Sequence, residues 1–340
     1  MTTQRGRSGP TILEVARAAR VSRQTVSNAL NFPHRVRPDT LARVLNTVDE
    51  LGYVPNRVAR SLRTRSTRQI GYRLDLERAD TVSFLQDHFL HALIRAAEDE
   101  GYLLLLFSSG RIDDELTRYA DMLRTRSVDG FVLSGIDPGD RRPDWLAERQ
   151  APFVCFGRPS SARPGPLWVD VDGAAGIEAA VDHLVATGHR AIGFLGWPST
   201  SGPGHHRLSG WQRAMKKHGL GTAHRASARD TLTDGTQGAL TLLRRSPAPT
   251  AVVAASDTFA LGCYAAARVL GLEIGRDLAV IGFDDSPTAS MVTPALTSIR
   301  QPLEEIGRSI MRLLVARLEG HVPEPSGVLL APSLVVRASA

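Results

Sequence analysis

The chain has 340 residues, 42% of them apolar, which allows two or three domains with sizeable cores and excludes a disordered protein. The net charge is +6, but residues 1–68 hold thirteen arginines and four acidic residues, so this segment carries +9 and the remainder −3. Such segregation is typical of a phosphate-binding segment joined to an acidic body, and a solvated basic tail is the simpler alternative.

Residues 11–31 predict two short amphipathic helices separated by a three-residue turn. Thr11 with Glu14 three positions later forms a capping box, so the first helix begins at Thr11. Ser22 is placed to cap the second helix. The expected inward residues of that helix are Val26, Ala29 and Leu30, which leaves an open side made of Arg23, Gln24, Thr25, Ser27 and Asn28.

A helix pair of this kind needs a third helix to bury its apolar stripe, and residues 38–51 supply one. Pro38 suits the first helical position, and Gly52 is a C-terminal cap. The expected apolar stripe of this helix contains Leu41, Val44, Leu45, Val48 and Leu51. Residues 1–54 are therefore predicted to form a helix-turn-helix head, the fold that places its second helix in the major groove of DNA.

The open side of the second helix carries residue types that read base edges. Arg23 matches guanine O6 and N7, Gln24 matches adenine N6 and N7, and Asn28 lies one turn further along. Other polar residues are better placed to bind phosphates and fix the register: Ser22, Thr25, Asn31, Arg35 and Arg37. For Ser22 and Thr25, helix capping alone is the alternative interpretation.

After residue 68 the periodicity changes to short apolar runs alternating with helical patterns. The runs are Leu103–Phe107, Gly130–Ser134, Phe153–Phe156, Ala191–Leu195, Ala251–Ala255 and Ala279–Gly282. This alternation is typical of an α/β fold with parallel sheets covered by helices, in which ligands bind beyond the carboxyl ends of strands.

Polar residues at these expected strand ends predict a small-molecule site. Arg207 follows the loop after the Ala191–Leu195 strand, Asp284 ends the Ala279–Phe283 strand, and Ser256 follows the Ala251–Ala255 strand. A guanidinium and a carboxylate together suit the vicinal hydroxyls of a sugar, while a surface ion pair or a helix cap is the alternative. Asp257 is expected to cap the helix that follows it.

A series of motifs resembles the lactose-repressor/galactose-repressor (LacI/GalR) family of bacterial transcription factors. The motifs stand in the family's order, and they are Val21–Asn31, Leu51–Leu62, Gly188–Arg190, Arg207–Trp211, Ser256–Asp257 and Gly282–Asp285. The resemblance implies a head at residues 1–54, a hinge helix and linker at 55–68, and a periplasmic-binding-protein-like core at 69–340. It further implies two doubly wound parallel-sheet subdomains, one of about 69–169 and 298–325 and the other of about 170–297 and 326–340.

The same resemblance assigns the hinge. Residues 56–62 are too short for a helix that is stable alone. In the family, two such hinges fold side by side on the minor groove, and Leu62 would wedge into the central base step with Asn56 and Ala59 alongside. A linker residue that packs on the body is the alternative for Leu62. The implied partners are pseudo-palindromic double-stranded operator DNA and a second copy of the chain in a homodimer.

Departures from the family pattern affect the ligand contacts. The family often has arginine where this chain has Asn28, which indicates a changed operator preference. The usual Asn-Pro-Phe-Phe-like segment reads Ser83–Gln86, and Gly157 replaces the usual aspartate before Arg158. The further candidate ligand residues are therefore weaker ones, namely Phe84, Asp87, Arg158 and Trp197.

Other classes of protein lack support in the sequence. The chain has no nucleophile elbow, phosphate loop, dinucleotide fingerprint or metal-spaced cluster, so we expect neither an enzyme nor a bound cofactor or metal. Cys155 and Cys263 are expected to be buried reduced thiols. A transport-associated binding protein would need a secretory signal, and no apolar segment follows the basic N-terminus or reaches the length of a membrane span.

These observations predict a cytoplasmic, allosteric, operator-specific regulator without membrane contact. The polar residues at the strand ends favour a sugar effector and a repressor of carbohydrate uptake or catabolism genes. A regulator that responds to a purine-like or other non-sugar corepressor is the alternative, because the sequence does not give the sign of the response.

Overall fold

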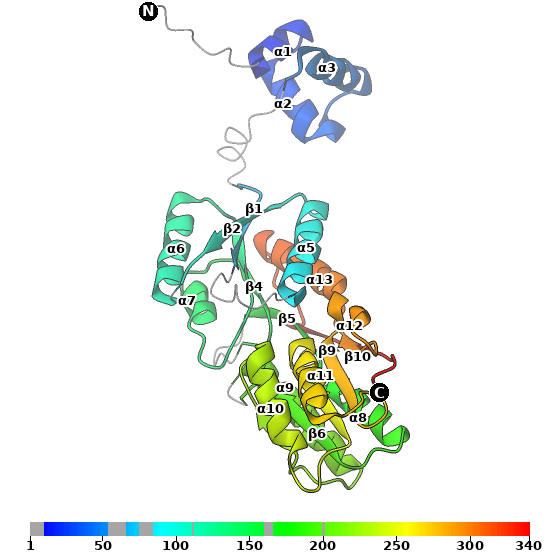
Figure 1. The fold of residues 1–340 in the computed structure, drawn as a ribbon. Helices are drawn as coiled ribbons and strands as arrows, with labels where there is room; N and C mark the ends of the chain where they lie inside the picture. The colour runs from blue at the N-terminus through cyan, green and yellow to red at the C-terminus, as the bar shows by residue number, and fades with distance from the viewer. Residues whose placement is uncertain (1–9, 54–65, 75–83, 111, 160–165, 199–200) are drawn as a thin grey trace, which may run out of the picture. The chain divides into compact units, whose positions relative to one another are not determined.

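The computed structural model describes residues 10–53, 66–74, 84–110, 112–159, 166–198 and 201–340. The chain divides into two compact units, Met1–Thr67 and Arg68–Ala340, which we call the head and the core (Figure 1). Residues 56–62 of the expected hinge lie outside the described residues.

The described residues of the head, 10–53 and 66–67, form three α-helices and one short 3₁₀-helix. They are α1 (Ile12–Ala18), α2 (Arg23–Asn31), η1 (Pro33–Arg35) and α3 (Pro38–Leu51). The predicted capping box is confirmed: the Glu14 amide donates to Thr11 Oγ1 at 3.4 Å, and the Thr11 amide donates to Glu14 Oε2 at 2.6 Å. The hydrogen bonds from Thr11 lower the pKa of the Glu14 carboxyl. Gly52 ends α3 with a φ of +60°.

The hydrophobic interior of the head joins its three α-helices through small and β-branched side chains. The buried apolar residues are Val15, Ala16, Ala19, Val26, Ala29 and Val44. Two parts of the predicted pattern are wrong. Leu45 and Leu51 are each 40% exposed, and Ser27 is buried although it was expected on the open side. Helical spacing gives the direction of a side chain but not how far the neighbouring helices extend over it.

The first sheet of the core has the order β11-β5-β4-β3-β1-β2, and all its strand pairs are parallel. Its strands are β1 (Gln69–Leu74), β2 (Leu103–Ser108), β3 (Gly130–Leu133), β4 (Phe153–Phe156), β5 (Leu167–Val171) and β11 (Gly327–Leu330). The helices that accompany it are α5 (Phe84–Asp99), α6 (Ile112–Thr125), α7 (Arg142–Glu148) and α13 (Leu303–Leu318). Helices α5 and α13 pack side by side (Figure 1). We call this sheet with its helices the first subdomain.

The second sheet has the order β12-β10-β9-β8-β6-β7 and is parallel except for the pair β10–β12. Its strands are β6 (Ile192–Gly196), β7 (Arg225–Ser227), β8 (Ala251–Ala254), β9 (Ala279–Asp284), β10 (Thr297–Arg300) and β12 (Ser333–Val335). Its helices are α8 (Gly173–Ala186), α9 (Gly202–Lys217), α10 (Leu232–Leu243), α11 (Asp257–Leu270) and α12 (Pro287–Met291). Helix α8 packs on α9, and α10 packs on α11. We call this assembly the second subdomain.

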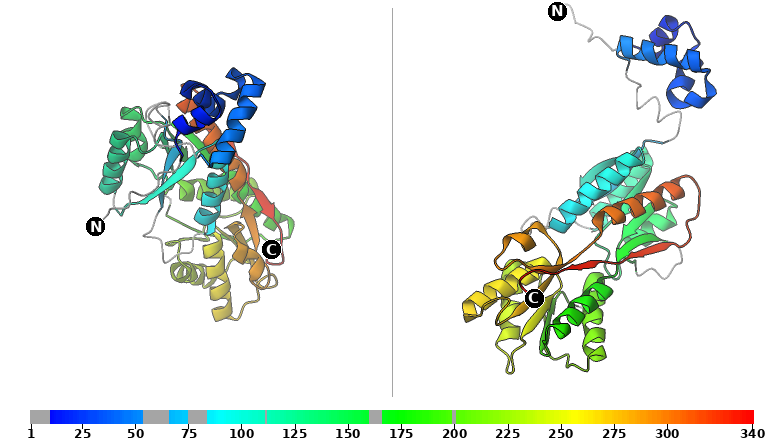
Figure 2. Two further views of the ribbon diagram at one scale, coloured as in Figure 1. Left: turned by 90° about the horizontal axis from the view of Figure 1, so that it is seen from above. Right: turned by 90° about the vertical axis from the view of Figure 1, so that its right-hand side faces the viewer.

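The chain passes between the subdomains three times, after β5, after β10 and after β11. The third passage is visible as the C-terminal segment that runs from one sheet to the other (Figure 2). Two of the expected subdomain boundaries lie earlier in the chain than the observed ones. The return to the second subdomain was expected at residue 326, but β11 still pairs with β5 of the first sheet. The return to the first subdomain was expected at residue 298, but β10 still pairs with β9 of the second sheet. An apolar run in the sequence predicts a strand, but it does not predict which of the two sheets that strand joins.

The two cysteines are buried free thiols, as predicted. Burial raises the pKa of Cys263 to about 12 and raises the pKa of Cys155 as well. Within the described part of the chain, no helix combines the length and apolar character needed to cross a membrane.

Candidate functional site

The start of α2 is fixed by Ser22. Its hydroxyl accepts a hydrogen bond from the Thr25 amide at 3.0 Å and lies 2.9 Å from the Thr25 hydroxyl. The N-terminus of α2 therefore has a side-chain cap, which satisfies one otherwise unpaired amide. Capping is established for Ser22, and a phosphate contact remains a prediction for Ser22 and Thr25.

The predicted base-reading residues share one side of α2. Arg23 and Gln24 are exposed, and Asn28 is half-buried. The Gln24 side-chain amide donates to Asn28 Oδ1 at 3.0 Å, so these two amides are aligned one turn apart. A donor and an acceptor remain available on each amide for other partners.

Arg35 and Arg37 are exposed after α2. The Arg35 guanidinium lies 4.9 Å from the centre of the Phe32 ring, and Arg37 is the residue before α3. The predicted minor-groove residues Asn56, Ala59 and Leu62 lie outside the described residues, as does the side chain of Asn31.

The core brings Arg207 and Asp284 together, as their expected strand-end positions required. Arg207 lies in α9, and Asp284 is the last residue of β9. Arg207 Nη2 and Asp284 Oδ1 are 3.9 Å apart, and the two side chains are 8% and 14% exposed. The pair faces the carboxyl ends of the strands of the second sheet.

Aromatic rings and a backbone carbonyl hold the Arg207 side chain. Its guanidinium carbon lies 3.6 Å from the centre of the Phe283 ring and 5.0 Å from that of Trp197, and Nη1 donates to the Ala255 carbonyl. Burial lowers the pKa of Arg207, and Asp284 opposes this shift. A flat guanidinium held against aromatic rings presents a fixed set of N–H donors to a ligand.

Asp284 is oriented by Gln301, whose side-chain amide donates to Oδ1 at 2.7 Å. Burial raises the pKa of Asp284 to about 8, and the neighbouring Arg207 acts in the opposite direction. The backbone of Asp284 has a φ of +111°, an uncommon conformation for a residue with a side chain. Strain of this kind is found where the surrounding structure fixes a functional side chain.

Ser256 is buried and caps α11, since its hydroxyl accepts from the Phe259 amide at 3.2 Å and donates to Asp230 Oδ1 at 2.7 Å. The predicted role of Asp257 as the cap is wrong. Asp257 is instead the first residue of α11, and its carboxylate accepts hydrogen bonds from the Ser286 and Ser298 hydroxyls at 2.7 and 2.6 Å.

The residues predicted in the first subdomain are less well assembled. Arg158 follows β4, and its Nε donates to Asp170 at 2.9 Å. Phe84 and Asp87 lie in the first turn of α5, where Asp87 is 61% exposed and 3.9 Å from His91. Among the described residues, neither Phe84 nor Asp87 forms a hydrogen bond or ion pair with Arg207 or Asp284.

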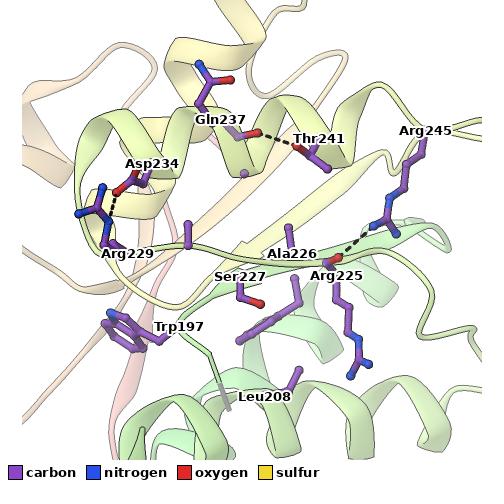
Figure 3. A pocket seen from close by; sticks show the side chains of 13 residues that line it. Trp197, Leu208, Arg225, Ala226, Ser227, Arg229, Asp234, Gln237, Thr241 and Arg245 are labelled. Atoms are coloured by element: carbon purple, nitrogen blue, oxygen red, sulfur yellow. Dashed lines mark hydrogen bonds and ion pairs between the residues drawn. The ribbon is translucent and has the colours of Figure 1, made fainter. Parts of the chain in front are cut away.

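Trp197 has a second environment besides Arg207. Its ring meets Phe259 edge to face at 5.6 Å and also lines a pocket of about 700 Å³ beside β7 (Figure 3). Around that pocket, Arg229 pairs with Asp234 at 2.8 Å, and Arg245 donates to the Arg225 carbonyl at 3.1 Å. All the residues that line this pocket belong to the second subdomain.

Sequence reasoning missed four groups at the site: the side chains of Asp230, Gln301, Asp170 and His206. Asp230 follows β7 and Gln301 follows β10, so the strand-end rule that selected Asp284 also applied to them. Asp170 within β5 and His206 within α9 carried no comparable signal, because their contacts to Arg158 join segments 12 and 48 residues apart.

Comparison with known proteins connects both units to regulators. Residues 11–56 match the lacI family of bacterial regulatory proteins, and residues 181–340 match a periplasmic binding protein-like domain. The transcriptional regulator CelR of Thermobifida fusca is 34% identical over 339 residues, which cover 98% of this chain and 99% of CelR.

Solved structures agree with this relationship. A complex of the transcriptional regulator CelR with cellobiose is 32% identical, with a TM-score of 0.74, over 97% of this chain and all of the other. The lac repressor dimer bound to operator and the anti-inducer ONPF is 26% identical, with a TM-score of 0.81, over 98% and 99%. The chain therefore belongs to the lacI family and is a DNA-binding transcriptional regulator.

Proposed function

We propose that this regulator represses genes for carbohydrate uptake or catabolism and leaves its operator when a small saccharide binds between the two core subdomains. The observation that carries the proposal is the buried Arg207 guanidinium, which lies against the Phe283 ring, near the Trp197 ring and beside the Asp284 carboxyl. Donors and acceptors fixed side by side on aromatic walls match the hydroxyls and apolar face of a sugar ring.

The comparisons support this choice of effector and of partners. A related regulator, CelR, forms a complex with cellobiose, and the lac repressor binds operator as a dimer. By analogy, two copies of this chain bind a pseudo-palindrome, with Arg23, Gln24 and Asn28 on base edges. The phosphate contacts in the proposal come from Ser22, Thr25, Asn31, Arg35 and Arg37.

The hinge completes the proposed DNA contact. In the proposal, Leu62 enters the central base step of the operator, with Asn56 and Ala59 on the minor groove. The variant Leu62→Ala is expected to weaken operator binding and to leave effector binding intact. Unchanged operator affinity of this variant would remove the wedge from the proposal.

The test is a fluorescence polarisation assay with labelled DNA from the region upstream of the protein's own gene, repeated with mono- and disaccharides, cellobiose among them, and with purine nucleosides and bases. Release from DNA by one saccharide is expected. Arg207→Ala should bind the DNA as the wild type does and no longer respond to that saccharide. Tighter DNA binding in the presence of a purine would overturn the inducer model in favour of a corepressor.

A further inference from the structure

Among the described residues, two hydrogen bonds connect the start of α9 in the second subdomain to loops of the first subdomain. Arg158 Nη2 lies 2.8 Å from His206 Nδ1, while Arg158 Nε is held by Asp170 at 2.9 Å. The Gly202 amide donates to Asp137 Oδ1 at 3.4 Å. Helix α9 thus meets the first subdomain through its first two turns, which also carry Arg207.

The contact between Arg158 and His206 has only one chemically reasonable protonation state. A guanidinium has donors and no acceptor, so Nδ1 of His206 must accept, and the imidazole must be neutral with its proton on Nε2. A protonated imidazole would direct an N–H at the guanidinium and place two cations 2.8 Å apart.

The surroundings of His206 favour its neutral form. Burial lowers the pKa of His206 below its ordinary value of 6.5, and Arg158 and His205 lower it further. Asp170 and Asp172 act in the opposite direction without reversing the shift. These groups come from β5, the start of α8, the loop after β4 and α9 itself. Among the described residues, Asp137 in the loop after β3 also faces the start of α9, where it accepts from the Gly202 amide.

His206 also directly precedes Arg207 in the chain. A movement of α9 away from Arg158 therefore moves the Arg207 guanidinium away from the first subdomain. We propose that His206 is a positioning residue: its neutral imidazole binds Arg158 and holds the two subdomains together around the effector site, and its protonation releases them. The contact itself is independent of the effector, and only the effect on ligand binding depends on the function proposed above.

Three variants separate this role from simple packing. His206→Asn keeps an acceptor oxygen two bonds from Cβ, where Nδ1 stands, and has no group that titrates near neutral pH. His206→Leu removes the acceptor. His205→Asn is the matched control, because His205 is exposed on the same turn of α9 and does not bind Arg158.

The first measurement is a titration of the full-length protein by two-bond ¹H–¹⁵N correlation spectra, with His206→Asn to identify the His206 signals. We expect the proton of neutral His206 on Nε2 and a pKa below 6.5. A proton on Nδ1 of the neutral ring would contradict the proposal, because Nδ1 could not then accept from Arg158. A pKa at or above 6.5 would also contradict it, because a contact with a guanidinium disfavours the protonated ring and must lower the pKa.

The second measurement follows the separation of the subdomains one pH unit above and one below the measured pKa. Spin labels on Arg118→Cys in α6 and Lys216→Cys in α9 report it by double electron–electron resonance, with labelled chains diluted into unlabelled protein; both native cysteines are buried. The distance distribution should change with pH in the wild type and in His205→Asn, and stay constant in His206→Asn. His206→Leu should show the low-pH distribution at both pH values. An equal pH response in His206→Asn, or none in the wild type, would overturn the proposal.

Calorimetry with cellobiose as the probe connects the contact to ligand binding. The loss of one hydrogen bond of about 1 kcal/mol predicts roughly fivefold weaker binding below the pKa in the wild type and no such change in His206→Asn. If cellobiose does not bind at either pH, cellobiose is not the effector of this chain, while the distance measurement still decides the role of His206.

Discussion

Asp284 combines an uncommon backbone conformation with a buried carboxyl group beside Arg207. Its pKa is raised to about 8 from an ordinary value of 3.8. The folded state therefore binds this proton more tightly than the unfolded state does. The resulting stabilisation is fully present below pH 3.8 and is lost as the pH rises through about 8.

The variant Asp284→Asn tests this at the scale of one residue. An amide imitates the protonated carboxyl, so the variant should have a higher melting temperature than the wild type above pH 8 and a flatter profile between pH 5 and 9. Differential scanning calorimetry measures both. Asp87→Asn is the control at an exposed carboxylate, and the same flattening there would show that the effect does not belong to Asp284.

At the scale of elements, the N-terminus of α2 depends on one hydroxyl. Ser22→Ala should destabilise the head by about 1 kcal/mol, because an amide loses its partner, and should weaken operator binding. Ser22→Asn restores the cap. Chemical denaturation and polarisation measure the two effects, and if Ser22→Asn restores stability without restoring operator affinity, the hydroxyl has a separate role on phosphate.

Helices α8 and α9 pack closely because Gly210 has no side chain. A Cβ at this position would lie 2.4 Å from the Ala174 carbonyl oxygen, a backbone atom. Gly210→Ala should therefore separate the two helices and destabilise the core by about 1–3 kcal/mol. It should also shift the position of Arg207, which lies one helical turn before Gly210. The control is Gly221→Ala, where a Cβ meets nothing within 4 Å. Equal denaturation midpoints for the two variants would contradict this account.

The sequence predicts best what depends on neighbours in the chain. The capping box at Thr11 and Glu14 was predictable because both partners lie in one helical turn. Arg207 and Asp284 were predictable because parallel strands bring their carboxyl ends to one edge. The hydrogen bond between Arg158 and His206 was not predictable, because it depends on how the two subdomains meet. The sheet partners of β10 and β11 were not predictable either.

At the scale of the whole molecule, positive charge is concentrated in residues 1–68, which carry +9 against −3 for the rest. Operator affinity should fall linearly with salt concentration on logarithmic axes, because each neutralised phosphate releases counterions. Arg35→Gln and Arg37→Gln should each reduce the slope by about 1, whereas Arg118→Gln in the core should not. Polarisation at four or more salt concentrations measures the slopes, and a flat dependence in the wild type would contradict phosphate binding by the head.

The three passages of the chain between the subdomains have a consequence for protein engineering. Because each subdomain is assembled from separate stretches of sequence, neither can be exchanged between relatives as one uninterrupted gene segment. The head, in contrast, is a single continuous segment that ends near residue 67. Recombination at that junction can therefore join a head to the complete core of another relative, while the exchange of one subdomain alone requires further junctions at the passages between the subdomains.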